Sequence, residues 1–196
     1  YVESSIGTPK ERAEITVLPE GRVRIVIGTQ PSGQGHETSF SQVIADLMHV
    51  PVDRIVIVMG DTKIVRLGGG THSGRSMRHA GTVMALASVD LIAEACDRAK
   101  ELFDTEEPVD FAEGCVFVRG TNYRMDLFAL AGETLATRGP LRVVRDNEMH
   151  TPVFPNGAAV CEVEVDPETG HVQITAYSTI DDVGRCINPL IVHGQT

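Results

Sequence analysis

Two glycine-rich segments contain the residues that are best placed to do chemistry. The first covers residues 28–38 and the second residues 68–76, and each separates a predicted strand from a predicted helix. Glycine leaves backbone N–H groups accessible, and next to a helix N-terminus such groups form a binding site for anions. Two segments of this kind on neighbouring strands could therefore close on one diphosphate group.

The first segment completes neither of the familiar phosphate-binding motifs. Gly28 and Gly33 have the spacing of a P-loop, but Gln34 occupies the position at which that motif requires lysine. Gly33, Gly35 and Thr38 approach the dinucleotide-binding fingerprint, which would have a third glycine in place of the threonine. Taken alone, this segment is therefore weak evidence for either type of nucleotide site.

The second segment adds side chains that donate hydrogen bonds. Arg75 offers a guanidinium fork suited to a phosphate, and three hydroxyl groups accompany it: Thr71, Ser73 and Ser76. The competing interpretation is that both segments are ordinary surface connections, with Arg75 exposed to solvent. Composition alone supports these two interpretations equally.

No combination of side chains has the spacing of a protein-ligated metal site. His36 and His72 are candidate proton carriers or ligand donors, but neither belongs to a His-x-His or His-x-x-x-His pair. Asp181 and Asp182 are adjacent, so their side chains would point to opposite faces of a strand and chelate poorly together. The cysteines lack CxxC spacing, and we expect them to be reduced and mostly buried: Cys96, Cys115, Cys161 and Cys186.

The composition limits the kinds of partner. With 17 basic and 27 acidic residues the net charge is −10, which is a poor electrostatic match for nucleic acid or an anionic membrane surface. The longest helical candidate is interrupted by Asp90 and Glu94, and it falls short of the roughly 18 apolar residues that a membrane span needs. The chain begins with Tyr1 rather than methionine, so we expect an internal segment of a longer protein, cut at both ends.

The elements that must position these segments follow from the apolar pattern. Alternating or continuous apolar residues predict strands: 13–17, 23–27, 55–59, 115–118 and a hairpin from 157 onward around the turn 166–170. Helical spacing predicts one helix after the first glycine-rich segment, started by a capping box at Ser39 and Gln42. It also predicts an alanine-rich helix at 82–103, with Val89 on its apolar side, and a short helix at 126–136 capped by Asp126. This order favours an α+β layer structure over a doubly wound sheet.

Three phrases of sequence occur together in a specific order. They are GQGHET at 33–38, GTHSGRS at 70–76 and DVGRCINP at 182–189, the last followed by a Gly-Gln pair at 194–195. Their order and spacing resemble the molybdopterin-binding large subunit of the xanthine oxidase family of molybdenum hydroxylases, including carbon monoxide dehydrogenase-like and aldehyde oxidase-like members. The resemblance covers essentially the whole chain. It implies an α+β, mixed-sheet molybdopterin-binding domain with helices packed on hairpins, in two lobes at about 1–105 and about 106–196.

The resemblance also implies a cofactor and the residues that hold it. Dithiolene sulfurs of a pterin would bind the molybdenum, in a cytosine dinucleotide form, so the protein would supply no metal ligand. The residues implied at the pterin and metal end are Gln34, Gly35, His36 and Thr38. Those implied at the diphosphate or nucleotide are Thr71, Ser73, Arg75 and Ser76, and those at the far end are Asp182, Asn188 and Gln195.

The chemistry implied by the resemblance is oxidation at molybdenum. The family hydroxylates an aldehyde, a purine or another N-heterocycle with water-derived oxygen, or oxidises CO, and electrons leave through FAD and [2Fe-2S] groups on partner domains or subunits. The cofactor performs the reaction and the protein orients it. We expect a cytoplasmic protein that acts on a small-molecule substrate and is oligomeric at full length.

Two departures and two alternatives accompany this reading. Ser73 and Gly74 stand where many relatives have Gly-Ser or Ala-Ser, and no Gly-x-Gly-Glu motif occurs in the chain. We therefore assign no catalytic residue and expect the segment to be inactive alone. The alternatives are a non-catalytic nucleotide-binding module that uses the same loops, and an interaction domain in which the loops merely connect elements.

Overall fold

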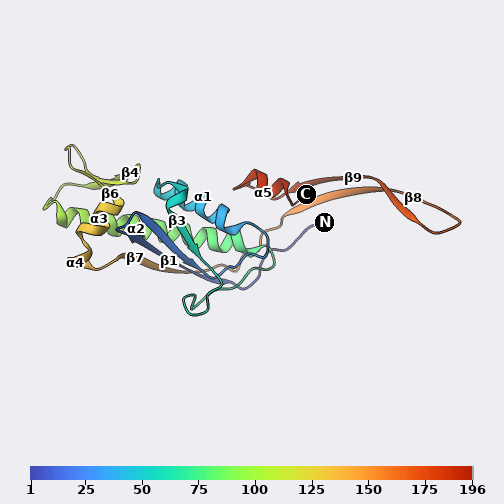
Figure 1. Ribbon diagram of the computed structural model, residues 1–196, viewed down its shortest axis with the longest axis horizontal. Helices are drawn as coiled ribbons and strands as arrows, with labels where there is room; N and C mark the ends of the chain where they lie inside the picture. The colour runs from blue at the N-terminus through green and yellow to red at the C-terminus, as the bar shows by residue number, and fades with distance from the viewer. Residues whose placement is uncertain (196) are drawn as a thin grey trace. The chain divides into compact units, whose positions relative to one another are not determined.

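The computed structural model describes residues 1–195 and divides the chain into two compact units. The larger unit consists of Gly7–His150, and the smaller unit combines Tyr1–Ile6 with the segment from Thr151 onward. Figure 1 labels the helices and strands of both units. This division differs from the predicted lobe limit near residue 105, because a strand that follows that limit completes the sheet of the larger unit.

The larger unit is built on a four-stranded mixed sheet with the order β3-β2-β1-β7. The strands β1 (Lys10–Leu18) and β2 (Arg22–Ile27) form the predicted antiparallel hairpin. The strand β3 (Ile55–Val58) pairs parallel to β2, which requires a crossover, and the helix α1 (His36–Met48) supplies it. The unpredicted strand β7 (Leu141–Glu148) pairs antiparallel to β1. The mixed α+β architecture predicted from the sequence is confirmed.

The core of the larger unit joins this sheet to the long helix α2 (Gly81–Leu102), which begins after a π-helical turn at Ser76–Ala80. The face of α2 that enters the core alternates medium and small side chains: Val83, Met84, Ala87, Leu91, Ala95 and Ala99. Small side chains let the helix axis approach the strands closely. The predicted apolar side of this helix is therefore wrong at Val89, which is 65% exposed.

The segment Ser76–Leu102 is long and apolar enough to cross a membrane by length and composition alone. This segment is apolar over a longer stretch than the sequence pattern indicates, in which Asp90 and Glu94 interrupt the helical candidate. The core helix of a soluble protein passes the same test, and one face of this helix packs into the core of the larger unit. Asp90 and Glu94 on the same helix form ion pairs with Arg145 and Arg98.

A second, smaller sheet packs at one end of the larger unit (Figure 1). Its three antiparallel strands follow one another along the chain: β4 (Val109–Ala112), β5 (Cys115–Val118) and β6 (Arg124–Asp126). The predicted helix at 126–136 is present as two short helices, α3 (Leu127–Glu133) and α4 (Leu135–Arg138). The predicted cap is confirmed, because the Asp126 carboxylate accepts a hydrogen bond from the Phe128 N–H at 2.9 Å.

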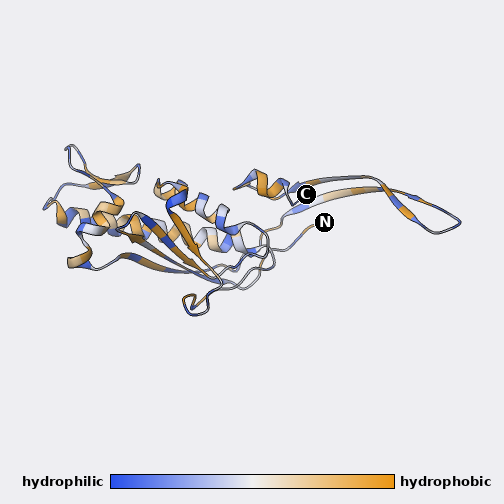
Figure 2. Cartoon of the chain, viewed as in Figure 1, coloured by the Kyte–Doolittle hydropathy of each residue, from blue (hydrophilic) through white to orange (hydrophobic). Residues whose placement is uncertain are grey.

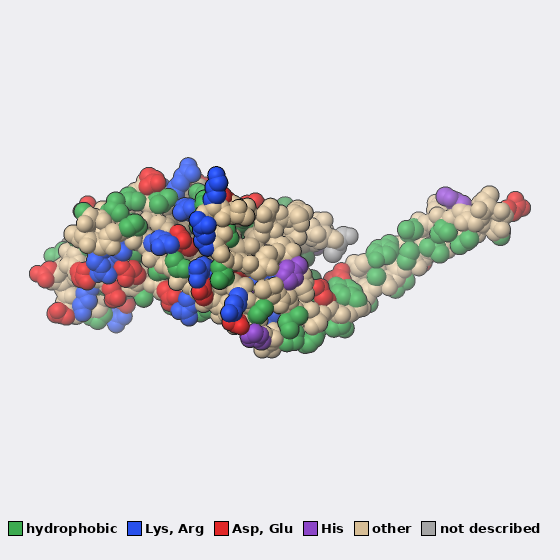
Figure 3. Space-filling model, turned by 90° about the horizontal axis from the view of Figure 1, so that it is seen from below, with side chains coloured by type: hydrophobic (Ala, Val, Ile, Leu, Met, Phe, Trp, Pro, Cys, Tyr) green, Lys and Arg blue, Asp and Glu red, His purple; other side chains and the backbone are tan. Residues whose placement is uncertain are grey.

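The smaller unit is dominated by the predicted hairpin, formed by β8 (Asn156–Val165) and β9 (Val172–Asp182), and it ends in the short helix α5 (Pro189–His193). The hydropathy colours of Figure 2 mark apolar residues along the hairpin, and Figure 3 shows hydrophobic side chains on its surface. Ile174, for example, is 64% exposed and Tyr177 is 63% exposed. The hairpin therefore has apolar side chains but no core of its own.

The four cysteines are free, as predicted. Their predicted burial is only half right. Cys96 and Cys115 are half-buried in the larger unit, whereas Cys161 and Cys186 are exposed in the smaller one. The exposed pair belongs to the hairpin and the segment that follows it, where the strands have no covering layer in the part of the chain that the structure describes.

Candidate functional site

The two glycine-rich segments lie side by side in the larger unit. Gly28 directly follows β2, and its backbone touches the backbone of Gly68 so closely that a Cβ on either residue would overlap the other. Only glycine permits this contact, because every other residue carries a Cβ. The predicted adjacency of the two segments is therefore confirmed, and we call them the first loop (residues 28–35) and the second loop (residues 68–75).

The first loop ends in a glycine cap at the start of α1. Gly35 has a left-handed backbone with φ 69°, and the helix begins at His36, three residues before the predicted capping box. The Ser39 hydroxyl lies inside the first turn and donates to the Gly35 carbonyl at 3.3 Å. Gln34 folds back on the loop, where its side-chain carbonyl accepts from the Ser32 N–H at 2.6 Å. The first N–H groups of α1 thus adjoin this loop, in the arrangement that favours anions.

His36, the first residue of α1, is the most enclosed of the residues predicted at the pterin and metal end. Its ring is buried and stacks on Phe40, with 4.9 Å between ring centroids. Burial lowers the pKa of the His36 imidazole, so the ring is neutral at pH 7. Thr38, by contrast, is exposed on the first turn of α1.

Arg75 does not present the phosphate fork that the sequence suggested. Its side chain is 0% exposed, and its guanidinium forms a 2.8 Å ion pair with Glu11. The remaining donors reach backbone carbonyls of Thr8, Lys10 and Gly70 at 2.9, 3.0 and 2.6 Å. Because these protein groups occupy the fork, Arg75 holds the second loop in place.

Glu11 is a site residue that the sequence analysis missed. Its carboxylate accepts hydrogen bonds from the N–H groups of Gly28 and Gly69, both at 3.2 Å, in addition to the Arg75 pair. In β1 the inward positions alternate, and Glu11 occupies the first of them, before Ala13 and Ile15. An acidic residue at a core-facing position of a strand was the available signal, because such a residue must have a buried partner.

Five buried polar side-chain atoms within residues 1–195 have no hydrogen-bond partner, and all of them lie in or directly beside the two loops. They are Thr29 Oγ1, His36 Nδ1, Thr71 Oγ1, Ser76 Oγ and His79 Nε2. Such atoms are rare in folded proteins, and each costs about 1–3 kcal/mol when it stays unsatisfied. Their concentration indicates that a ligand completes the hydrogen bonding here. Thr29 and His79 were not predicted.

His79 differs from the hydroxyl groups because its free ring nitrogen can accept a hydrogen bond but cannot donate one. It lies in the π-helical turn, and its Nδ1 is 3.2 Å from the Pro9 carbonyl, which can only accept a hydrogen bond. The proton therefore resides on Nδ1 and leaves a lone pair on Nε2. Burial, aided by the positive charges of Arg75 and Arg78, lowers the pKa of this ring and keeps it neutral. A ligand must offer an N–H or O–H group at this position.

Ser73 and His72 shape the second loop from its exposed side. Ser73 has φ 50°, a left-handed conformation that non-glycine residues seldom adopt. The His72 ring nitrogen Nε2 lies 3.1 Å from the Gly69 carbonyl. This conformation lies at Ser73-Gly74, where the resemblance led us to expect a different order of residues.

The three predicted residues of the third phrase belong to the smaller unit. Asp182 accepts from the Gly184 N–H at 2.9 Å, and Asn188 caps α5 by accepting from the Ile191 N–H at 3.0 Å. Gln195 lines a pocket of about 660 Å³. Its other lining residues come from the same unit: Tyr1, Thr179, Asp181, Val183, Cys186, Val192 and His193. Of the three, Gln195 thus faces a cavity, while the other two have local structural contacts.

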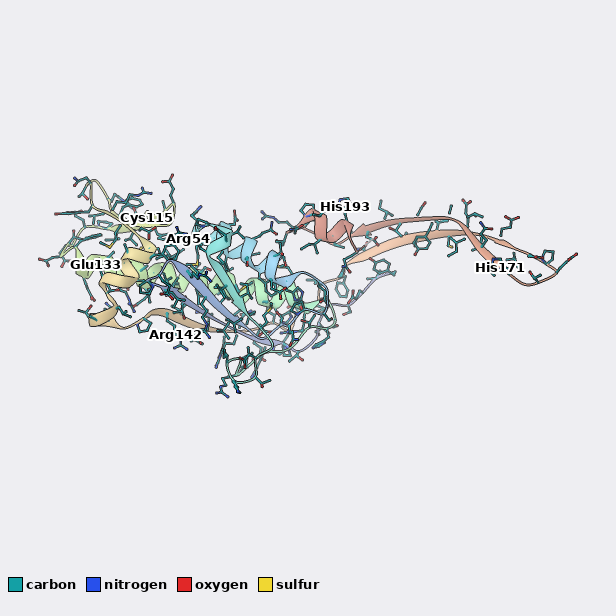
Figure 4. All side chains as sticks on the ribbon, viewed as in Figure 1. Arg54, Cys115, Glu133, Arg142, His171 and His193 are labelled. Carbon is teal, nitrogen blue, oxygen red and sulfur yellow. The ribbon has the colours of Figure 1, made fainter. Side chains whose placement is uncertain are left out.

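Within residues 1–195, no three His, Cys, Asp or Glu side chains are grouped so that they could hold a metal ion. The labelled histidines in Figure 4, His171 and His193, lie at separate places in the smaller unit, one near the hairpin turn and the other on α5.

Comparison with known proteins places the chain in a family. The sequence profile of the molybdopterin cofactor-binding domain matches residues 1–196. The chain is 30% identical to the gamma subunit of the 6-hydroxypseudooxynicotine dehydrogenase complex of Paenarthrobacter nicotinovorans, over 94% of this chain and 24% of that protein. It is 31% identical to the carbon monoxide dehydrogenase large chain of Afipia carboxidovorans, with the same coverage.

Solved structures agree with this assignment. A crystal structure of Cu,Mo-CO dehydrogenase superposes with a TM-score of 0.84 at 28% identity, covering 100% of this chain and 27% of that one. Quinoline 2-oxidoreductase from Pseudomonas putida 86 superposes with a TM-score of 0.80 at 27% identity, covering 100% and 28%. The chain spans about a quarter of the length of these relatives. The resemblance found in the three phrases is confirmed, and the chain belongs to the molybdopterin cofactor-binding domain family.

Proposed function

We propose that the two loops of the larger unit form part of the cradle for a molybdenum–molybdopterin cofactor in a hydroxylase. The observation that carries this proposal is the cluster of unsatisfied buried atoms in and beside the loops. These atoms differ in their hydrogen-bonding capacity, since the hydroxyl groups can donate or accept a hydrogen bond, whereas His79 Nε2 can only accept one. A pterin dinucleotide matches such a set, because its rings carry N–H groups and its diphosphate carries acceptor oxygens.

The donors that suit the diphosphate are local and uncharged. Arg75 is neutralised by Glu11, and the chain as a whole carries a net charge of −10. Phosphate oxygens would therefore meet backbone N–H groups of the loops and of the α1 N-terminus, together with the hydroxyls of Thr71 and Ser76. The first loop, with Gln34, Gly35 and His36, would meet the pterin end.

The remaining predicted site residues take smaller parts in this proposal. Ser73 and Thr38 are exposed on the loop and helix surfaces, where they could meet a nucleotide or solvent. In the smaller unit Gln195 stays our proposal for a cofactor-binding residue, and Asp182 and Asn188 hold the backbone of the segment that carries it. A cytosine nucleotide on the pterin is our proposal for that end.

When bound, the cofactor supplies molybdenum chemistry, in which a carbon is hydroxylated with water-derived oxygen. The chain's own residues bind and orient it, and the buried His36 and His79 rings stay neutral at pH 7. We propose an aldehyde, an N-heterocycle or CO as the substrate of the whole protein. The relatives named for carbon monoxide, quinoline and nicotine derivatives support the N-heterocycle and the CO in this range.

We further propose that FAD and [2Fe-2S] groups on partner subunits or domains receive the electrons. The relatives named as a complex subunit and a large chain support an assembly of several parts. The four free cysteines fit a reducing compartment such as the cytoplasm. The family match favours this function over a free-nucleotide module or an interaction domain.

The direct test is metal and nucleotide analysis of the full-length protein purified from its own host. We expect molybdenum near one atom per chain, and CMP after acid release of the cofactor. A folded preparation that contains neither molybdenum nor nucleotide would overturn the proposal. Release of AMP or GMP in place of CMP would retain the cofactor and correct only its nucleotide.

A further inference from the structure

One buried ion pair joins the first loop to the second, and we call this pair, Glu11 with Arg75, the loop latch. The Glu11 carboxylate accepts from the backbone N–H of Gly28 in the first loop and of Gly69 in the second, both at 3.2 Å. The two side chains are 2.8 Å apart and are 1% and 0% exposed. One carboxylate therefore fixes a backbone position in each loop.

Arg75 holds the second loop from its other end. Its guanidinium donates to the Gly70 carbonyl within the loop, to the Thr8 carbonyl before β1 and to the carbonyl of Lys10, the first residue of β1. The guanidinium lies where a Cβ on Gly69 would be, so glycine is required there. A buried ion pair is tolerated when hydrogen bonds satisfy both charges, and here each charge has several.

The backbone positions that the latch fixes are next to the unsatisfied atoms. Thr29 directly follows Gly28, Thr71 directly follows Gly70, and Ser76 directly follows Arg75. A ligand that bonds to atoms of both loops needs a fixed distance between the loops, because hydrogen bonds weaken steeply when their geometry is lost. The latch is the described contact that sets this distance through side chains.

We propose that Glu11 and Arg75 are positioning residues of the cofactor site, which set the spacing of the two loops without touching the cofactor. The identity of the ligand rests on the proposed function, whereas the coupling of the loops does not. Arg75 thereby acts through Glu11 and the loop backbone, and the phosphate oxygens are left to N–H and hydroxyl donors.

The chain offers a matched control in a second buried arginine. Arg98 on α2 is 4% exposed and pairs with Glu94 at 2.7 Å. It also donates to backbone carbonyls, including those of Gly139 and Pro140 at 2.7 and 3.0 Å. Arg98→Lys therefore disturbs a buried ion pair of the same construction that contacts neither loop.

The experiment compares Glu11→Gln and Arg75→Lys with Arg98→Lys in the full-length protein purified with its partners. Three quantities are measured: molybdenum per chain, thermal midpoint, and amide hydrogen exchange in peptides that cover the two loops. For the latch variants we expect a roughly tenfold or greater fall in molybdenum and faster exchange in both loops together. For Arg98→Lys we expect a lowered thermal midpoint with wild-type molybdenum and wild-type loop exchange.

Two results would overturn the inference. One is wild-type molybdenum content in a folded Glu11→Gln protein, and the other is faster exchange in one loop without the other. If Glu11→Gln does not fold, the double variant Glu11→Gln with Arg75→Gln removes both charges and serves in its place. Wild-type protein without molybdenum would overturn the proposed function alone, because loop exchange still tests the latch.

Discussion

Arg75 and Arg98 have the same kinds of hydrogen-bond partner, but only the surroundings of Arg75 contain buried polar atoms without a partner among the described residues. Both arginines are buried, pair with one glutamate and bind several backbone carbonyls. Around Arg98 the neighbouring Thr134 hydroxyl donates to the Leu130 carbonyl at 2.8 Å. Around Arg75, buried hydroxyl and imidazole atoms remain unsatisfied. The buried polar atoms named beside Arg98 are thus hydrogen-bonded within the chain, whereas several beside the loops are not. This difference supports a functional role for the loops.

The largest expected effect separates the two arginines by stability. Arg75→Met leaves Glu11 buried and unpaired, and we expect it to lower the free energy of unfolding by about 3–5 kcal/mol. Arg98→Met should cost less, about 1–3 kcal/mol, because the Glu94 side chain is 29% exposed and keeps Arg138 as a partner at 3.0 Å. Urea denaturation followed by circular dichroism measures both, and equal losses would break the comparison.

Glycine substitutions should sharpen the same contrast. Gly28→Ala places a Cβ against the Gly68 backbone and the Glu11 carboxylate, so we expect a loss of about 1–3 kcal/mol. Gly132→Ala in α3 meets only Pro19, at an ordinary contact distance of 3.7 Å. It should stabilise the protein by up to about 1 kcal/mol, because alanine favours a helix. Thermal unfolding of the two variants tests this, and a neutral Gly28→Ala would contradict the close contact of the loops.

Acid should destabilise the protein through the two buried histidines beside the loops. The pKa values of His36 and His79 are lowered mainly by burial. In mildly acidic solution these two rings are therefore protonated in the unfolded chain while they are still neutral in the folded chain. The free energy of unfolding therefore falls as the pH drops below about 6.5, by at most about 1.4 kcal/mol per pH unit for each ring. Urea denaturation at pH 7, 6 and 5 measures the slope. His79→Gln should reduce that slope, and an unchanged slope would refute this assignment.

The smallest effects concern single hydroxyl groups. Thr71→Val removes an unsatisfied oxygen, so the cofactor-free protein should be unchanged or up to about 1 kcal/mol more stable, while molybdenum content falls. Thr134→Val removes a hydroxyl that bonds to both Leu130 and Arg98, and should cost about 1 kcal/mol with no change in molybdenum. Unfolding free energies and elemental analysis of both variants would decide. If both variants changed the unfolding free energy and the molybdenum content equally, Thr71 would not contact the cofactor.

Local sequence signals predicted the local features of the fold. The hairpins at β1–β2 and β8–β9 and the Asp126 cap follow from alternation and turn residues within a few positions of each other. The start of α1 was predicted too late in the chain. The helix begins after Gly35, which has a left-handed backbone, whereas the predicted capping box at Ser39 and Gln42 lies inside the helix. The exposed face of α2 was missed at Val89 because small alanines, not the larger apolar residues, define its contact with the sheet.

The two loops of the candidate site could be predicted from the sequence, but the side-chain contacts between distant residues could not. Glycine spacing and the three phrases identified both loops and several of the residues with unsatisfied atoms. The partner of Arg75 was out of reach, because Glu11 lies 64 residues away and meets it only after β1 and the second loop are assembled. For the same reason His79 was not predicted, because its ring orientation depends on the Pro9 carbonyl, which is distant in the sequence.

The exposed hairpin of the smaller unit has a consequence for colloidal behaviour. A two-stranded hairpin is marginal by itself, and unpaired strand edges beside apolar side chains invite other chains to pair with them. Val163 in β8 and Ile174 and Tyr177 in β9 supply such side chains, while Glu162 and Glu164 flank Val163 in β8. Charged residues that flank an apolar strand oppose such pairing. Neutralising them should make the separated chain self-associate at lower concentration, with no direct effect on the loops that hold the cofactor.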